Sequence, residues 1–378
     1  MNTCSTYVSR LKKDLGFRNS RSAVSLHSHT MHSREYLGRF PEYISRIPVA
    51  SFLIEREVGR VHLYKRCIVD FRRIYWTPPL SAREAFRLEA SQIEKKLGLA
   101  PLVSLTDHDN VEAGLHLSML QETAHAPVSV EWSVPFEGSV FHLGVHNLPA
   151  SDANAWMDQF RRFTSKPVQK RLRSLLQELH SDPSVLLILN HPYWSAEGVA
   201  AGQHRVSLSA FLSEFRTNLH GIELNGLRSK KENHAVLALG REVGLPVVSG
   251  GDRHGCEPNA VLNVTSALSF AEFVEEIRVE RRSQIVLMPQ FFEPLRLRLL
   301  ESAWHALADA PGEFERRHWM SRVFFEAEDG STKPLTQLAG TRFHKFVDRF
   351  RFVMALLTSP QMRPALRLAF LGTEESGL

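Results

Sequence analysis

Short apolar runs alternate with longer amphipathic stretches through the middle of the chain. The runs are rich in β-branched residues, which is typical of buried strands. The predicted strands are residues 23–26, 102–105, 128–130, 141–145, 185–189, 221–224, 246–249 and 284–288. Helix-length stretches separate most of them, so the pattern predicts βα units that build a parallel sheet or barrel, and therefore an α/β fold.

Two of the helical stretches have clear ends. Residues 81–97 begin at Ser81, a favourable N-cap, and keep Ala85 and Leu88 near one face. Residues 232–243 are followed by Gly244, a typical C-terminal cap. These patterns predict two helices.

The alternation also predicts the domain organisation. Residues 23–289 form the barrel, and residues 1–22 form an N-terminal segment. Residues 37–80 are too long for an ordinary βα loop and indicate an inserted lid or subdomain. After about residue 290 the strand pattern ends, which predicts a helical C-terminal extension over 290–378, with Phe343, Phe346 and Phe350 at helical spacing. This extension packs on the barrel or on another subunit, or else contacts a partner or a membrane surface.

Composition narrows the class of protein. The chain has 378 residues, 43% of them hydrophobic, which suffices for a sizeable core. Three cysteines without a CxxC pair predict neither a disulfide framework nor a thiolate zinc site. The sequence shows no signal-peptide pattern and no apolar run that could cross a membrane, so we expect a cytoplasmic protein. The net charge of +5 is small and spread along the chain, and carries little weight.

Ligand-type side chains gather where the predicted strands end. The groups are His27-Ser28-His29, Thr106-Asp107-His108-Asp109, Glu131, Asn190-His191-Pro192 and Asp252-Arg253-His254. In a parallel barrel these ends share one face, where active sites of such folds lie. We therefore expect these residues to converge on one pocket.

The residue types favour a metal site. Imidazole and carboxylate without thiolate suit zinc, manganese or iron, and Glu131 has two oxygens with which to bridge ions. His27 and His29 point to the same side of an extended chain, as do Asp252 and His254. A catalytic triad is disfavoured because the sequence has no GxSxG nucleophile elbow and no cysteine beside these histidines.

An ordered series of motifs resembles the signature of the PHP (polymerase and histidinol phosphatase) family. The series is His27-Ser28-His29-Thr30, Leu105-Thr106-Asp107-His108-Asp109, Val130-Glu131, Phe141-His142-Leu143-Gly144, Asn190-His191-Pro192, Gly221-Ile222-Glu223 and Gly251-Asp252-Arg253-His254. The resemblance spans roughly residues 23–260. It implies a distorted TIM-like (β/α)7 barrel that holds two or three divalent ions of Mn, Zn or Fe and cleaves a phosphate mono- or diester.

The resemblance also implies a ligand set. His27, His29, Glu131 and Asp252 would hold one ion, and His108 and His254 a second. Glu131 would bridge to a third ion bound by His142 and His191. The family motif usually continues to Ser-Asp-Gly, whereas this chain has Ser33-Arg34-Glu35. Either Glu35 supplies the missing carboxylate, which we favour, or that ion loses a ligand.

Other residues receive lesser roles. Asp107 is predicted to orient an imidazole or take up a proton, although a turn or N-cap role is equally natural. Arg253, Arg228 and Lys230 are candidate phosphate clamps, and for Arg253 the alternative is an ordinary exposed arginine. Glu223 closes a predicted strand and could contribute to the pocket, but the family does not usually bind metal there, so a structural role is favoured. His142, within an apolar strand, is either a ligand or a hydrogen-bonded core histidine.

The substrate stays open between a small phosphorylated molecule and a nucleotide, with nucleic acid as a further candidate, and the C-terminal extension offers a route to an oligomer. Two alternative functions also remain. One is a metal-stabilised module that binds a partner or nucleic acid without catalysis. The other is hydrolysis of a bond other than a phosphate ester, because an activated water does not by itself select its electrophile.

Overall fold

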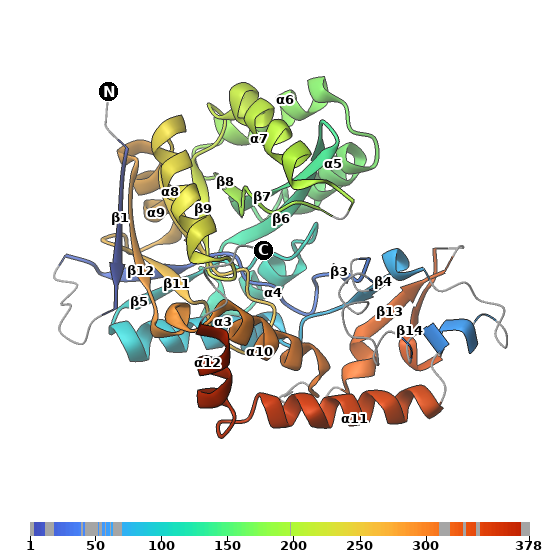
Figure 1. Cartoon of the computed structure of the whole chain (residues 1–378). Coiled ribbons are helices and arrows are strands. Elements are labelled where there is room, and N and C mark those ends of the chain that lie inside the picture. Colours follow the sequence, from blue (N-terminus) through green and yellow to red (C-terminus); the bar gives the residue numbers. More distant parts are fainter. Residues whose placement is uncertain are drawn as a thin grey trace. The chain divides into compact units, whose positions relative to one another are not determined.

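The structure is a computed structural model of the whole chain (Figure 1). It describes residues 4–11, 19–38, 41, 52, 55–56, 58–60, 62, 70–196, 198–309, 318–327, 330–337 and 341–371. Most of the predicted insertion, residues 37–80, therefore lies outside the described residues. The chain divides into two compact units: unit 1 is Met1–Ser33 with Ser81–Leu295, and unit 2 is Arg34–Leu80 with Arg296–Leu378.

Unit 1 contains two five-stranded sheets. The first has the strand order β1-β12-β11-β2-β5. Its strands are β1 (Ser5–Arg10), β2 (Ser22–Ser25), β5 (Ala100–Val103), β11 (Val261–Thr265) and β12 (Arg282–Leu287). β2 pairs in parallel with β5, as predicted, whereas β11 runs antiparallel to both β2 and β12. The N-terminal segment thus adds β1 to the edge of this sheet.

The second sheet carries most of the candidate site residues and has the order β10-β9-β8-β7-β6. Its strands are β6 (Val128–Phe136), β7 (Ser139–Leu148), β8 (Leu186–Asn190), β9 (Gly221–Asn225) and β10 (Val247–Gly250). β8, β9 and β10 are parallel to one another. β7 is antiparallel to β6 and to β8, so the expectation of a wholly parallel sheet is wrong here. The cause is the tight turn at Glu137 and Gly138, both at positive φ, which leaves no room for a crossover helix.

Neither of these sheets closes into a barrel within the described residues. Isolated bridges nevertheless link them at two places, between His108 and Glu131 and between Ser28 and Arg253. At the first, the Glu131 amide donates to the Asp107 carbonyl at 3.1 Å; at the second, the Asp252 amide donates to the His27 carbonyl at 2.7 Å. Both links lie at residues of the predicted site.

Helices flank both sheets of unit 1. They are α3 (Ala82–Gln92), α4 (Glu112–Ser118), α5 (Ala153–Ser165), α6 (Gln169–Ser181), α7 (Ala201–Phe215), α8 (Lys230–Val243) and α9 (Phe270–Glu275). The two predicted helices are confirmed: Ser81 caps α3 in a capping box, and α8 ends at Gly244 with φ of 70°. The main core lies between the second sheet and α5, α6, α7 and α8, with Trp132, Phe160 and Phe211 fully buried.

Unit 2 has its own sheet and core. The sheet has the order β14-β13-β4-β3, from β3 (Glu35–Tyr36), β4 (Ile74–Trp76), β13 (Val323–Glu326) and β14 (Thr332–Pro334). Its helices are α10 (Leu295–Leu307), α11 (Thr341–Leu357) and α12 (Arg363–Leu371). The extension after residue 290 is therefore not purely helical: β13 pairs with β4 of the insertion, a long-range pairing that the short apolar run 323–326 does not reveal. In the described part of the chain, no helix is long and apolar enough to span a membrane.

Candidate metal centre

The strand ends of unit 1 bring the predicted ligands together. His27 and His29 follow β2, His108 follows β5, His191 follows β8, and Asp252 follows β10. His142 lies near the start of β7, but its antiparallel register places it opposite Asn190 at the end of β8. The reversed direction of β7 therefore brings His142 to the same edge as the other ligands.

Glu131 of β6 is fully buried at the centre of this group. Its two carboxylate oxygens are surrounded by imidazole nitrogens. The distances to Oε2 are 3.0 Å from His27 Nε2, 3.3 Å from His29 Nε2 and 3.2 Å from His108 Nδ1, and those to Oε1 are 3.0 Å from His191 Nε2 and 3.3 Å from His142 Nδ1. A carboxylate shared in this way has the geometry of a bridging ligand.

Asp252 closes the other side of the cluster. Its Oδ1 lies 3.7 Å from His27 Nε2, 3.6 Å from His29 Nε2 and 3.6 Å from His254 Nδ1. The His254 ring stacks on the His29 ring at 4.1 Å between centroids. His254 and His108 keep somewhat exposed side chains, whereas His27, His29 and Glu131 are buried, so the cluster has a deep part and a more open part.

Overlapping sets of potential ligand atoms lie within 4.8 Å of one another. They are His27, His29 and Asp252; His27, Glu131 and His191; and His108, Glu131 and His142. His142 is thus grouped with His108, whereas the family resemblance places it with His191. The first two sets have His27 in common and the last two have Glu131 in common, which is the arrangement that neighbouring ions with common ligands require.

The backbone at this edge is strained. His27, His191 and Asp252 have φ values of 61°, 24° and 53°, in the left-handed region that non-glycine residues rarely adopt. Such strain is typical of functional sites, where the surrounding structure holds it in place. Here it occurs at three residues whose side chains enter the same cluster.

The electrostatics keep both central carboxylates ionised. Burial alone would raise the pKa of Glu131, but His27, His108 and His142 together hold this pKa well below its ordinary value. Asp252 behaves likewise: burial opposes ionisation, and the His29 hydrogen bond with the charges of His27 and Arg228 lowers its pKa well below the usual range. Ionised carboxylates are the state in which these two residues can bind a divalent ion, whereas the surrounding imidazoles must be neutral to bind it.

Unpaired polar atoms provide a direct test of whether a metal fits. His27 Nε2, Glu131 Oε2 and His142 Nδ1 are buried and lie close to other polar atoms of the cluster, but none of them forms a well-aligned hydrogen bond with the described residues. Buried polar groups without a partner are costly, and native proteins rarely contain them without a reason. All three atoms belong to the ligand sets, so divalent ions bound here would satisfy them.

Glu223 of β9 contacts two of the candidate ligands, His27 and His191, which the sequence did not predict. Its Oε1 lies 2.5 Å from His27 Nδ1, and its Oε2 accepts hydrogen bonds from the His191 amide and from Asn225 Nδ2. It therefore fixes the ring of one candidate ligand and the backbone of another, as carboxylates behind metal-bound histidines do. Its place in the Gly221-Ile222-Glu223 motif was the only signal available.

The remaining predicted residues have distinct surroundings. Both oxygens of Asp107 accept hydrogen bonds from Thr30, which fixes the loop after His29. Arg253 is buried rather than exposed, and its guanidinium donates to Glu89 Oε1 and to the carbonyls of Gly255 and His29. These bonds favour a positioning role, while its contact with substrate stays a prediction.

The other three candidates, Arg228, Lys230 and Glu35, differ in their relation to the cluster. Arg228 donates to Asp252 Oδ2 at 3.2 Å and thus reaches the cluster. Lys230 is the first residue of α8, and its contact with a substrate stays a prediction. Glu35 belongs to unit 2, so its role as a ligand also stays a prediction.

Comparison with protein families and with curated proteins finds no match for this chain. Among solved structures, an amidohydrolase from Chromobacterium violaceum is 16% identical over 47% of this chain and 83% of its own, with a TM-score of 0.33. A proposed metal-dependent phosphoesterase from Bifidobacterium adolescentis is 14% identical over 54% and 92%, with a TM-score of 0.33. PsfC from Pseudomonas syringae is 12% identical over 76% and 98%, with a TM-score of 0.38. Likenesses this weak assign neither a family nor an activity.

Proposed function

We propose that this protein is a metal-dependent hydrolase that cleaves a phosphate mono- or diester at a site of two or three divalent ions. The observation that carries the proposal is the buried Glu131 carboxylate with five imidazoles around its two oxygens. Zinc, manganese and iron all accept this donor set. The bridges at His108 and Arg253 support a distorted ring of seven strands, β2 and β5 to β10, as the scaffold.

The surroundings of the cluster suit an anionic substrate. Arg228 is half-buried beside Asp252 and leads directly into the N-terminus of α8, which is capped by Ser229. A helix N-terminus and a guanidinium both favour a phosphate group. Lys230, at the first position of this helix, would add a positive charge. We assign substrate binding to Arg228 and Lys230 on these grounds.

Each residue then has a task. His27, His29, Glu131, Asp252, His108, His142, His191 and His254 would hold the ions. Bound divalent ions would supply an activated water near neutral pH and polarise the phosphoryl group. Arg228 would orient the ester, while Glu223 and Asp107 keep the ligand loops in position. Two hydrogen bonds from Thr30 hold Asp107 in place, which supports a positioning role, while a direct part in proton transfer stays a prediction.

Metal content and ester hydrolysis test the proposal together. Elemental analysis is run on the wild type, on Asp252→Ala and on Asp158→Ala, which removes an exposed aspartate whose ion pair among the described residues is with Arg161. Each protein is then assayed with phosphomonoesters and phosphodiesters beside amides and lactones, with added manganese or zinc. We expect at least two ions per chain and metal-dependent ester hydrolysis in the wild type and in the control, and loss of both in Asp252→Ala.

Other outcomes would contradict parts of the proposal. Bound metal with turnover of amides or lactones alone would exclude phosphate esters as the substrate class. Bound metal without any turnover would favour a structural role for the ions. Absence of metal after purification in metal-replete medium would rule out the site itself.

A further inference from the structure

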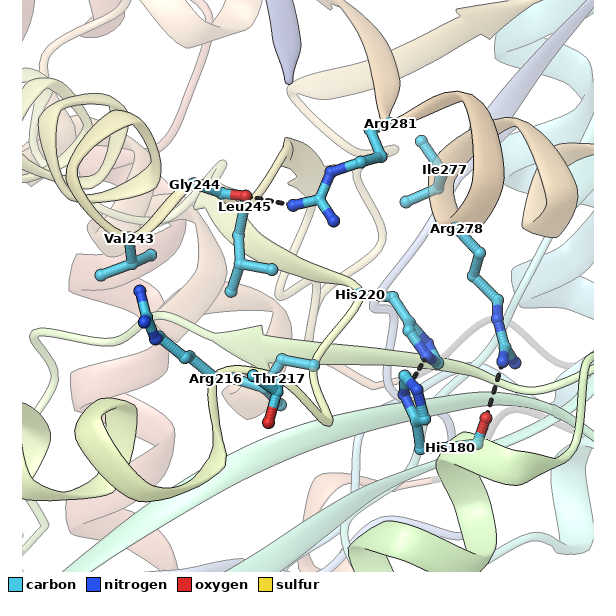
Figure 2. Close-up of a pocket in the computed structure, with 11 residues that line it drawn as sticks. His180, Arg216, Thr217, His220, Val243, Gly244, Leu245, Ile277, Arg278 and Arg281 are labelled. Carbon is cyan, nitrogen blue, oxygen red and sulfur yellow. Dashed lines mark hydrogen bonds between the residues drawn. The ribbon is translucent and has the colours of Figure 1, made fainter. Parts of the chain in front are cut away.

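A basic cavity lies in unit 1, outside the candidate metal centre. Its volume is about 280 Å³, and Figure 2 shows the residues that line it. The polar part of its wall consists of Arg216, Arg278, Arg281, Thr217, His180 and His220. The apolar part consists of Leu219, Val243, Leu245 and Ile277. No carboxylate side chain belongs to this lining.

The cavity is at the opposite end of the strands from the metal centre. His220 directly precedes β9, Leu245 precedes β10, and Arg281 directly precedes β12. The candidate ligands His191 and Asp252 instead follow β8 and β10. Strands of this length separate their two ends by roughly 15 Å, since each residue advances about 3.3 Å. The two sites are therefore distinct.

The arginines of the cavity are not neutralised by carboxylates. Within the described residues, none of Arg216, Arg278 and Arg281 forms an ion pair with Asp or Glu. Burial even lowers the pKa of Arg278, which the more distant Asp182 only partly offsets. A wall with uncompensated positive charge favours binding of an anion.

Two of these arginines, Arg278 and Arg281, also hold backbone carbonyl groups in place. Arg278 donates to the carbonyl oxygens of His180, Asp182 and Val185, and Arg281 donates to that of Gly244, where helix α8 ends. Cations commonly stabilise helix C-termini in this way. The bonds engage both terminal nitrogens of Arg278 but only Nη2 of Arg281. Arg216 makes no side-chain hydrogen bond or ion pair with the described residues, so donors remain.

We propose that this cavity binds a small phosphorylated anion through Arg216, Arg281 and Thr217. Guanidinium groups match the oxygens of a phosphate with paired donors, and the Thr217 hydroxyl adds a further donor. The cavity is larger than a phosphate group, and the apolar wall of Leu219, Val243, Leu245 and Ile277 would contact an organic part. Free phosphate and a phosphate monoester share the recognised chemistry, and the experiment below separates them.

Calorimetric titration of the full-length protein tests this site. Inorganic phosphate and ribose 5-phosphate are titrated into the wild type before and after chelation of its metals, so that binding at the metal centre is recognised separately. Arg216 is exposed, and its side chain forms no hydrogen bond or ion pair with the described part of the chain, so Arg216→Gln and Arg216→Glu should leave folding intact. Arg162→Gln and Arg162→Glu make the same changes of charge at an exposed position of α5 outside the cavity.

We expect phosphate to bind after chelation as well as before it. Arg216→Gln should raise the dissociation constant about tenfold, because one charge-assisted hydrogen bond contributes roughly that factor to the affinity. Arg216→Glu should abolish binding, because it places a negative charge beside the anion. The Arg162 variants should bind as the wild type does. Tighter binding of ribose 5-phosphate than of phosphate would identify an organic monoester as the ligand, and equal affinity would identify free phosphate. Binding that disappears with the metals, or that is equally affected by the Arg162 variants, would overturn the proposal, as would no binding up to about 10 mM. The result does not depend on whether the metal centre is catalytic.

Discussion

Glu223 shows at the scale of single residues how the candidate site is held in place. Its carboxylate contacts His27 Nδ1 and accepts from the His191 amide. Glu223→Gln keeps the size and shape of the side chain but removes the negative charge beside His27 Nδ1. We therefore expect the metal affinity to fall about 10- to 100-fold. Competition with a chromophoric chelator measures the affinity. The matched control is Glu178→Gln, at an exposed position of α6, and an equal loss in both variants would refute a positioning role.

A buried histidine makes the stability of unit 1 depend on pH. Burial, with the charges of Arg278 and His180, lowers the pKa of His220 from 6.5 to about 2. The unfolded chain therefore takes up a proton below pH 6.5 that the folded protein excludes, and stability is lost as the pH falls. The loss attributable to His220 is about 2 kcal/mol between pH 7 and pH 5.

Urea denaturation of the metal-free protein at these two pH values checks this prediction. In His220→Gln the amide oxygen can still accept from the Leu187 amide, as His220 Nδ1 does. The variant should therefore lose about 2 kcal/mol less than the wild type over this range. An identical loss in both proteins would mean that His220 does not titrate differently in the folded and unfolded states.

The sequence predicted which residues gather at the site better than how they are fixed. His27, His191 and Asp252 could be inferred because each follows an apolar run, and strand ends share an edge. Glu223 could not be assigned, because its contact with His27 joins residues that are far apart in sequence. The burial of Arg253 against Glu89 was missed for the same reason. The role of each residue as a metal ligand stays a prediction until an ion is measured.

At the scale of elements, the close packing of β9 against β10 depends on one residue without a side chain, Gly250. A Cβ atom on Gly250 would lie 1.5 Å from Glu223 Oε1, which is held by the hydrogen bonds of that carboxylate. The φ angle of Gly250 is not positive, so the requirement is for space alone. Gly250→Ala must displace Glu223 and should destabilise the protein by about 1–3 kcal/mol, with weaker metal binding.

Gly202→Ala provides the matched control for this change. Gly202 lies in α7 with nothing within 4 Å of an added Cβ atom, so its substitution should be neutral or slightly stabilising. Chemical denaturation and metal titration of both variants measure the two effects. If Gly250→Ala were as stable as Gly202→Ala and bound metal normally, the close packing of β9 on β10 would have no functional importance.

The sequence located elements more reliably than their partners. Each predicted strand between residues 23 and 288 is present, because a run of apolar, β-branched residues is a local pattern that favours a buried strand. The direction of β7 was not predicted, since pairing depends on turn length and on distant strands, and β1 and β11 were not predicted as strands at all. β13 was missed because a short half-buried strand has a weak pattern.

At the scale of the whole molecule, the chain consists of two units that are each discontinuous in sequence. The sequence separated the insertion from the C-terminal extension, whereas β4 of the former pairs with β13 of the latter. That pairing joins residues about 250 positions apart, and no local pattern encodes it. The described candidate ligands other than Glu35 all lie in unit 1, so metal binding should stabilise the two units unequally.

The positions of the tryptophans allow the stabilisation of each unit by metal to be measured separately. Trp132, Trp156 and Trp194 lie in unit 1, and Trp76, Trp304 and Trp319 lie in unit 2. In protein labelled with 5-fluorotryptophan, fluorine NMR during thermal unfolding reports on each unit separately. Metal at 100 times its dissociation constant should stabilise unit 1 by about 2.7 kcal/mol and raise the temperature at which its three signals are lost. The unit 2 signals should move much less. An equal shift of all six signals would contradict the separate stabilisation of unit 1, because a ligand stabilises the whole cooperative unit that binds it and both units would then unfold as one.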